Sequence, residues 1–293
     1  MSQDYNVQWY PGHMAKTRRL MAQNLKLVDA VCELRDARIP ESSRNPDLDE
    51  ICGDKPRMIL LNRADLADPK QTKLWKTHLK AQGFTVVETD CKSKKGVAEV
   101  APAVRVLLQD KLERYAAKGQ AGRMLRVMVV GIPNVGKSTF INQISGRKGA
   151  AKAENRPGVT RGTQWVTVDK GLELLDTPGI LWPKFDDPEV GRRLAYTGAV
   201  KDAILDTETL ASGLMELLKV RYPEALTQRY KLDPESAADG LELLEAAGRK
   251  RGFLVSGGEV DLQRVAQTVL EEFRSGKLGR LTLEGPMEQE AAE

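Results

Sequence analysis

The stretch "MLRVMVVGIPNVGKST", residues 124–139, joins the most strand-like run of the chain to a glycine-rich loop and the start of a helix. Its second half matches the pattern G-x-x-x-x-G-K-[ST]. In such a loop, backbone N–H groups surround phosphate oxygens, Lys137 reaches the β- and γ-phosphates, and the Ser138 hydroxyl binds Mg²⁺. A chance glycine turn is the alternative, but a strand before the loop and a helix after it disfavour that explanation. The stretch therefore predicts a nucleoside triphosphate site in an α/β fold.

Two further segments supply what a phosphate loop needs around Mg²⁺. "LELLDTPGI", residues 172–180, places a carboxylate at a strand end, so Asp176 is expected to hold Mg²⁺ and the amide of Gly179 to contact the γ-phosphate. "RPGVTRG", residues 156–162, lies between the two motifs, and Thr160 is a candidate for a second hydroxyl on Mg²⁺. A threonine in a Pro-Gly loop is ordinary, so its position carries this prediction. Together with Lys137, Thr160 is a candidate catalytic residue.

A base-reading motif lies roughly seventy residues upstream, in "ILLNRADLAD", residues 59–68. Guanine is selected by a carboxylate that accepts from its N1 and N2 hydrogens, and adenine presents the wrong pattern there. Asn-Lys-x-Asp after an apolar strand is the usual carrier, and Asn62-Arg63-Ala64-Asp65 has Arg in place of Lys. Because an Arg side chain also stacks on a base plane, we expect guanine specificity, with Asp65 as the reader.

A second loop is expected to support the base. "DCKSKKG" begins about 25 residues after Asp65, and its Asp90-Cys91-Lys92 would bring a backbone N–H near Cys91 to the guanine oxygen. Every part of a guanine-nucleotide site is then present in rotated order, with the base reader before the phosphate loop. Moving the cut point of a chain leaves the sheet unchanged where the termini fall in exposed segments, so the order predicts a circular permutation.

The composition limits the class of protein but does not indicate a function. The 293 residues, 41% apolar and 29% charged, are typical of a soluble globular protein with one sizeable α/β domain and a smaller one. The net charge of +4 suits a nucleic-acid partner and an ordinary enzyme equally. Three cysteines without CxxC spacing argue against a disulfide scaffold or a zinc site. Without a signal-like pattern or a bilayer-length apolar run, we expect a cytoplasmic protein.

The pattern of apolar residues divides the chain. Strands alternate with helices up to about residue 180, which predicts a mostly parallel sheet covered on both faces. We expect helices over 15–29, 70–83 and 97–119, and strands over 29–36, 57–62, 84–89, 124–131, 164–169 and 172–176. Only helical periodicity follows. The predicted domains are 1–185, a GTPase domain with an N-terminal basic helix, 186–284, a helical domain, and 285–293, an acidic tail.

The rotated order, with "PGHMAK", "DARIPESSRNP", "GIPNVGKST", "DTPGILWPKF" and a helical C-terminal part, resembles the bacterial ribosome biogenesis GTPase A family. These are circularly permuted P-loop GTPases of the YlqF type, and the resemblance spans nearly the whole chain. It implies GTP and GDP as ligands, Mg²⁺, and GTP hydrolysis stimulated by the maturing large (50S) ribosomal subunit during a late assembly step. The implied partners are rRNA and ribosomal proteins, and the helical domain over 186–284 is implied to bind RNA. No membrane partner is expected, and no oligomer is implied.

The resemblance also assigns residues. The implied nucleotide contacts are Asn62, Arg63, Ala64, Asp65, Asp90, Cys91, Asn134, Val135, Gly136, Lys137, Ser138, Thr139 and Gly179. Position 180 is Ile, which cannot orient water as the Gln of Ras-like enzymes does, and the family points to His13 as the catalytic group. A polar residue in an N-terminal turn is the alternative for His13. Asn134 resembles the asparagine that lets related GTPases use K⁺; its alternative is a turn residue.

Basic segments are the candidates for rRNA contact. They are Lys16–Arg19, Arg192 with Arg193, and Arg249–Arg251, and solvated helix faces are the plain alternative. Two rival functions share the nucleotide site. One is a permuted GTPase that acts on tRNA or the small ribosomal subunit, and the other is a GTP-gated RNA-binding module in which hydrolysis is incidental.

Overall fold

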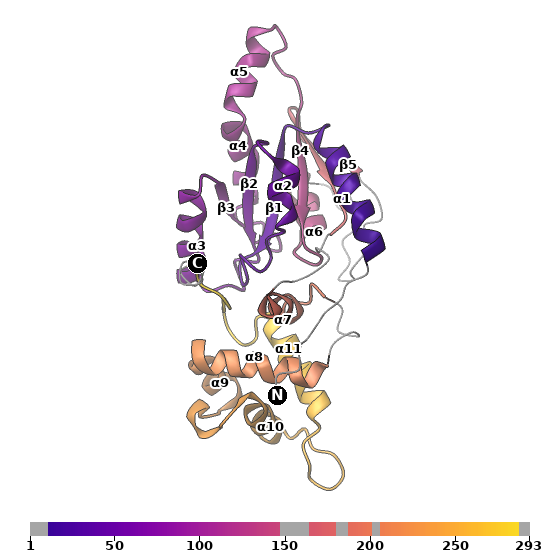
Figure 1. Cartoon of the computed structure of the whole chain (residues 1–293). Coiled ribbons are helices and arrows are strands. Elements are labelled where there is room, and N and C mark those ends of the chain that lie inside the picture. The colour runs from indigo at the N-terminus through magenta and orange to yellow at the C-terminus, as the bar shows by residue number, and fades with distance from the viewer. Residues whose placement is uncertain (1–10, 147–163, 180–186, 201–205, 287–293) are drawn as a thin grey trace. The chain divides into compact units, whose positions relative to one another are not determined.

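The structure, a computed structural model, describes residues 11–146, 164–179, 187–200 and 206–286, with side chains from residue 18 onward (Figure 1). The chain divides into two compact units, Met1–Pro188 with Glu284–Glu293, and Glu189–Leu283. The division after Pro188 lies three residues beyond the boundary expected from the sequence. Glu284, which the sequence places in the helical domain, belongs to the first unit because its side chain and carbonyl are hydrogen-bonded there.

The first unit is built on a six-stranded sheet of order β3-β2-β1-β4-β6-β5. The strands are β1 (Ala30–Asp36), β2 (Arg57–Asn62), β3 (Thr85–Glu88), β4 (Leu125–Gly131), β5 (Gln164–Asp169) and β6 (Leu172–Asp176). All neighbours pair in parallel except β5, which returns antiparallel to β6 around the predicted turn at 170–171. Every residue of the central strand β1 is buried, and the predicted mostly parallel sheet is confirmed.

Helices cover both faces of this sheet, as expected for parallel strands. Side chains alternate along each strand, and the register places Val31, Met128 and Leu175 on one face. Helices α1 (Pro11–Leu25) and α2 (Asp47–Cys52) pack on that face, and α3 (Pro69–Ala81) packs beside them through Trp75 and Leu79. Helices α4 (Val97–Leu107) and α6 (Lys137–Ile144) are in mutual contact and pack against β3 and β6 respectively.

The helices of the first unit depart from the sequence prediction in three places. The stretch expected as one helix over 97–119 is broken at Leu108, where α4 ends and α5 (Gln109–Ala117) begins. The N-terminal helix ends at Leu25 rather than at residue 29. Helix α2 was not predicted, because six residues between Pro46 and Gly53 are too few to show a helical period.

The second unit consists of helices, in agreement with the predicted helical C-terminal part. They are α7 (Pro188–Tyr196), α8 (Thr207–Arg221), α9 (Pro223–Tyr230), α10 (Gly240–Arg251), α11 (Leu262–Ser275) and the 3₁₀ turn η2 (Pro234–Ser236). Aspartates cap several of them, since the carboxylates of Asp206 and Asp239 accept hydrogen bonds from the first free N–H groups of α8 and α10. Of the helices in the described ranges, none is long and apolar enough to cross a membrane.

Candidate nucleotide site

The site residues predicted from distant parts of the sequence meet at one edge of the sheet. Strands β1, β2, β4 and β6 run in parallel, so their carboxyl ends lie together. The last residues of these strands are Asp36, Asn62, Gly131 and Asp176. The base-reading motif and the phosphate loop are thus neighbours although about seventy residues separate them in sequence.

The phosphate loop connects β4 to α6 with a backbone that few residues can adopt. Gly136 has φ +104°, and a Cβ atom on it would lie 2.5 Å from Nδ2 of Asn62, so glycine is required there. Asn134 has φ +59°, in the left-handed region that asparagine tolerates. Because α6 begins at Lys137, its first N–H groups, including those of Ser138 and Thr139, have no partner within the helix. This arrangement favours a phosphate group.

Lys137 is buried against the loop that carries it. Its Nζ donates to the carbonyl oxygens of Gly131, at 3.0 Å, and Ile132, at 2.8 Å. Burial lowers the pKa of the ammonium group to about 8, against the opposing attraction of Asp176. The lysine therefore holds the loop to its own strand, and its charge is available at the position where phosphates would lie.

Asp176 has the chemistry expected of a magnesium-site residue. Its side chain is buried, and within the described residues Oδ1 has no hydrogen-bond partner. Burial raises the pKa of the carboxyl group to about 6, although Lys137 opposes the shift. Because Mg²⁺ prefers carboxylate and hydroxyl oxygens together with water, this unpaired oxygen fits the ion. Thr160, the predicted source of a second hydroxyl, lies outside the described residues, as does Ile180, which follows Gly179 in the sequence.

Gly179 lies directly against the phosphate loop. A Cβ atom on it would come within 2.9 Å of both Lys137 Nζ and Pro133 Cα. Any other residue would displace the lysine or the loop, so glycine allows this close approach. The predicted γ-phosphate contact through the Gly179 backbone is compatible with this position.

Asn62 connects three segments of the site. Its Nδ2 donates to the Val135 carbonyl at 2.7 Å, and its Oδ1 accepts from the Thr89 hydroxyl at 3.2 Å and from the Cys91 N–H at 3.3 Å. The amide is 2% exposed. The sequence predicted a nucleotide contact here, and the structure places this side chain as the link between the phosphate loop and both base-side loops.

Arg63 bridges the base-reading loop and the phosphate loop. It has φ +59°, and its guanidinium donates to the Asn134 carbonyl at 2.7 Å. Its Nε also lies 3.9 Å from the carboxylate of Asp36, which holds Arg38 through two hydrogen bonds of 2.9 and 2.7 Å. Asp36 begins the segment "DARIPESSRNP", but no role for it was predicted from the sequence. An acidic residue at a strand end, followed by arginine two positions later, was the available signal.

The two carboxylates on the base side have different environments. Asp65 lies at the surface of the protein. Neighbouring atoms still remove part of the water from its carboxyl group, and this desolvation, together with the negative charge of the nearby Asp90, raises its pKa. Asp90 accepts hydrogen bonds from the N–H groups of Lys92 and Ser93, and these hold its pKa low against burial. Asp90 is therefore engaged in its own turn, whereas Asp65 is placed to accept hydrogen bonds from a base.

The remaining base-side residues are mainly structural. The Ala64 N–H donates to the Thr89 carbonyl at 3.2 Å, which fixes the base-reading loop to the end of β3. Cys91 is buried, and burial raises the pKa of its thiol to about 12. The thiol is consequently unreactive at neutral pH.

Several predicted RNA-binding cations are paired with carboxylates. Arg18 pairs with Glu50 and Arg192 with Glu189, and two weaker pairs of 3.6 Å join Arg249 to Glu245 and Arg251 to Glu272. His13 lies in the first turn of α1, and its side chain, like that of Lys16, is outside the described part of the chain.

Comparison with known proteins agrees with this site. A family described as "50S ribosome-binding GTPase" matches residues 126–222. The match begins in β4 and includes the phosphate loop but not the base-reading motif, which lies upstream as the predicted permutation requires.

Relatives match over nearly the full length. The chain is 50% identical over 285 residues to ribosome biogenesis GTPase A of Priestia megaterium, covering 97% of this chain and 98% of that protein. It is 49% identical over 282 residues to the protein of the same name from Bacillus cereus, covering 96% and 95% respectively. The solved structure of GNP-bound YlqF from Thermotoga maritima has a TM-score of 0.63 and 30% identity, covering 92% of this chain and 98% of that one.

Proposed function

Because this chain belongs to the ribosome biogenesis GTPase A family of GTP-hydrolysing enzymes, we propose that it binds the maturing large ribosomal subunit, promotes a late assembly step, and is stimulated by that particle. The proposed partners are rRNA and ribosomal proteins. The observation that carries the proposal is the joining of a phosphate loop and a guanine-reading loop through Asn62, in a chain that its ribosome-associated relatives match from end to end.

The proposed residue roles are supported by the positions of the side chains. Lys137 and the N–H groups at the start of α6 would hold the phosphates, and Asp176 and Ser138 would hold Mg²⁺, which would supply positive charge beside the phosphates. Asp65 accepts from the base and Arg63 lies over it. Thr160 is proposed as the second hydroxyl on the metal.

The catalytic group is proposed to come from the N-terminal segment. Position 180, which follows Gly179, is Ile, and an aliphatic side chain cannot orient the attacking water, so the group that does so is expected elsewhere in the chain. His13 is the proposed supplier. K⁺ at Asn134 is proposed to compensate charge where other GTPases use an arginine finger.

Steady-state hydrolysis of GTP tests the proposal. We expect a slow intrinsic rate in potassium buffer that purified large ribosomal subunits increase by at least about 10-fold, while small subunits and tRNA leave it unchanged. Sodium buffer should lower the stimulated rate, and His13→Ala should abolish stimulation without changing GDP affinity. Stimulation by small subunits or by tRNA alone would replace the proposed partner with one of these.

The GTP-gated binding module makes a different prediction for the same variant. If His13→Ala no longer hydrolyses GTP and yet restores large-subunit assembly in cells that lack the wild-type protein, binding is the function and hydrolysis is incidental. If assembly fails together with hydrolysis, the enzymatic proposal holds.

A further inference from the structure

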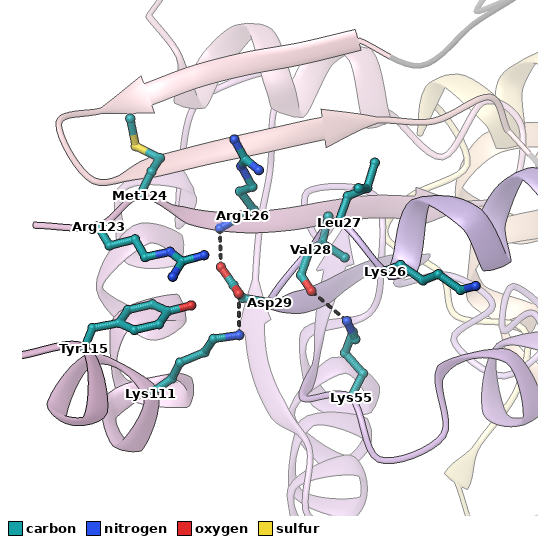
Figure 2. Close-up of a pocket in the computed structure, with 10 residues that line it drawn as sticks. All are labelled: Lys26, Leu27, Val28, Asp29, Lys55, Lys111, Tyr115, Arg123, Met124 and Arg126. Atoms are coloured by element: carbon teal, nitrogen blue, oxygen red, sulfur yellow. Dashed lines mark hydrogen bonds and ion pairs between the residues drawn. The ribbon is translucent and has the colours of Figure 1, made fainter. Parts of the chain in front are cut away.

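A cavity of about 480 Å³ lies at the end of the sheet opposite the nucleotide site (Figure 2). Its lining includes Asp29, which directly precedes β1, and Arg126, the second residue of β4. The nucleotide-site residues follow the carboxyl ends of these parallel strands, so both sites can be used at once. The full lining is Lys26, Leu27, Val28, Asp29, Lys55, Lys111, Tyr115, Arg123, Met124 and Arg126.

The lining carries a large excess of positive charge. Five of its residues are lysine or arginine, and Asp29 is its one carboxylate. Both oxygens of Asp29 are already engaged, Oδ1 by Lys111 Nζ at 2.5 Å and Oδ2 by the Arg126 N–H at 2.8 Å. Asp29 thus neutralises Lys111, and Arg126 pairs with Glu173 outside the lining at 3.3 Å, so two of the five cations have an acidic partner.

Three of the cations lack an acidic partner. Across the described ranges, no carboxylate oxygen lies within the 4.0 Å ion-pair limit of Lys26, Lys55 or Arg123. Lys55 instead donates to backbone carbonyls, including that of Val28 at 2.6 Å, and burial and the neighbouring Lys111 lower its pKa. The basic segments proposed from sequence differ, because several of their arginines are paired with glutamate.

An aromatic ring holds two of the cations in place. Arg123 Cζ lies 4.7 Å and Lys111 Nζ 5.7 Å from the centroid of the Tyr115 ring, on either side of it (Figure 2). Nearby, Arg126 lies 5.1 Å from the ring of Trp165, which is 38% exposed. Flat guanidinium groups and exposed aromatic rings beside cations are the chemistry with which proteins hold unpaired bases and phosphates of RNA.

The shape of the site favours an extended polyanion over a single small anion. The cations come from the end of α1, the segment before β2, α5 and the start of β4, and Figure 2 shows Lys26 directed away from the others. Helix α5 has no buried residue and extends beyond the end of the sheet at which β4 begins (Figure 1). Cations on separate segments, one of them a projecting helix, match successive phosphates of a strand.

We propose that this cavity binds a single-stranded segment of RNA. Its phosphodiester groups would lie on Lys26, Lys55 and Arg123, and an unpaired base would lie on the guanidinium plane of Arg123, whose other face Tyr115 covers. The inference rests on the proposed function, because a ribosomal particle supplies such RNA, and it assigns that contact to a defined surface of the first unit.

Fluorescence anisotropy with a fluorescein-labelled 12-nucleotide uridylate RNA tests the proposal, with GDP and Mg²⁺ saturating the nucleotide site. The variant is Lys26→Glu with Arg123→Glu, which breaks no ion pair among the described residues. The control is Lys73→Glu with Lys80→Glu, two exposed lysines of α3 with the same change in net charge. We expect the variant to bind the RNA at least about 10-fold more weakly than the wild type. The slope of the logarithm of the binding constant against the logarithm of the salt concentration should be smaller in magnitude by about 1.4, for two lost phosphate contacts.

The outcomes separate the alternatives. If the variant and the control lose RNA affinity equally, or if neither loses any, the cavity is not an RNA-binding site. Displacement of the RNA by equimolar inorganic tripolyphosphate would also overturn the proposal, because that result indicates a small-anion site. Intrinsic GTP hydrolysis of the variant should match the wild type. If large subunits fail to stimulate GTP hydrolysis by the wild-type protein but the variant still binds RNA more weakly than the control, the proposed function is wrong and the RNA-binding site is supported.

Discussion

At the scale of single residues, Asp65 is the proposed reader of the base. A carboxylate accepts from both N1–H and N2–H₂ of guanine, whereas an asparagine amide at this position would direct N–H toward one of these donors. We expect Asp65→Asn to weaken GDP binding by about 100-fold, since hydrogen bonds to charged groups contribute roughly 1.5–3 kcal/mol. Titration with fluorescent nucleotides measures this effect.

Xanthine nucleotides provide the control for that change. Xanthine has a carbonyl in place of the N2 amino group, so the asparagine can donate to it, and the variant should bind XDP more tightly than GDP. ADP should bind to neither protein. Unchanged selectivity in the variant would show that Asp65 does not read the base.

The positions of the candidate site residues were easier to predict from the sequence than the contacts that each one makes. Lys137, Asp176 and Asp65 stand where their motifs place them because strand and helix context determines those positions. The contacts of Lys137 with Gly131 and Ile132, and of Arg63 with Asn134, depend on how loops from different strands meet. No local pattern encodes such contacts, so Asp36 and its hold on Arg38 were missed.

At the scale of elements, the site depends on one amide that joins three loops. Asn62→Asp keeps the shape of the side chain but removes the donor to Val135 and places a negative charge 2.7 Å from a carbonyl oxygen. We expect GDP affinity to fall at least about 30-fold and the free energy of unfolding to fall by about 3 kcal/mol, because the carboxylate is buried. Isothermal titration and urea unfolding measure the two effects.

An exposed position provides the matched control. Gln228→Glu makes the same amide-to-carboxylate change on the surface of α9 and should alter neither quantity by more than about 0.5 kcal/mol. Wild-type GDP affinity in Asn62→Asp would contradict the role of Asn62 as a link between the loops.

Elements with a clear apolar pattern were the most predictable. Strands β2 and β6 were predicted with their observed bounds because their largely buried apolar runs end in a polar residue, Asn62 and Asp176 respectively. Strand β5, which is mostly exposed, was predicted from its alternating Val166 and Val168 and the turn that joins it to β6. The break at Leu108 escaped prediction because the sequence continues in good helix formers. Helix α9 was missed because it begins two residues after α8 ends, at Pro223, which pre-forms the first turn.

At the scale of the whole molecule, the chain returns to its first unit after the helices. The Glu284 carboxylate accepts hydrogen bonds from the N–H groups of Glu41 and Ser42, the latter at 2.9 Å, and its carbonyl accepts from the Trp75 indole at 3.0 Å. Glu284 is 3% exposed. A residue near the end of the sequence is therefore part of the loop that follows β1.

Removing this carboxylate should loosen that loop. We expect Glu284→Ala to increase the amide exchange rates of Glu41 and Ser42 by about 30-fold, because two buried donors lose a charged acceptor worth roughly 2 kcal/mol. Hydrogen–deuterium exchange of the full-length protein measures this. Glu284→Gln, which retains an acceptor oxygen, should give a smaller increase, and equal protection in all three proteins would contradict the role assigned to Glu284.

The order of strands in the sheet also has a consequence for synthesis. Strands β1, β2 and β3 form one contiguous half, and β4, β5 and β6 form the other, with β1 and β4 as the seam. During translation the base-reading half leaves the exit tunnel first. Until β4 follows, one edge of the all-buried strand β1 is exposed to water, and unpaired apolar edges are where nascent chains aggregate. Because of the permutation, the nascent chain most needs protection from aggregation in the interval after β1, β2 and β3 have left the exit tunnel and before β4 follows.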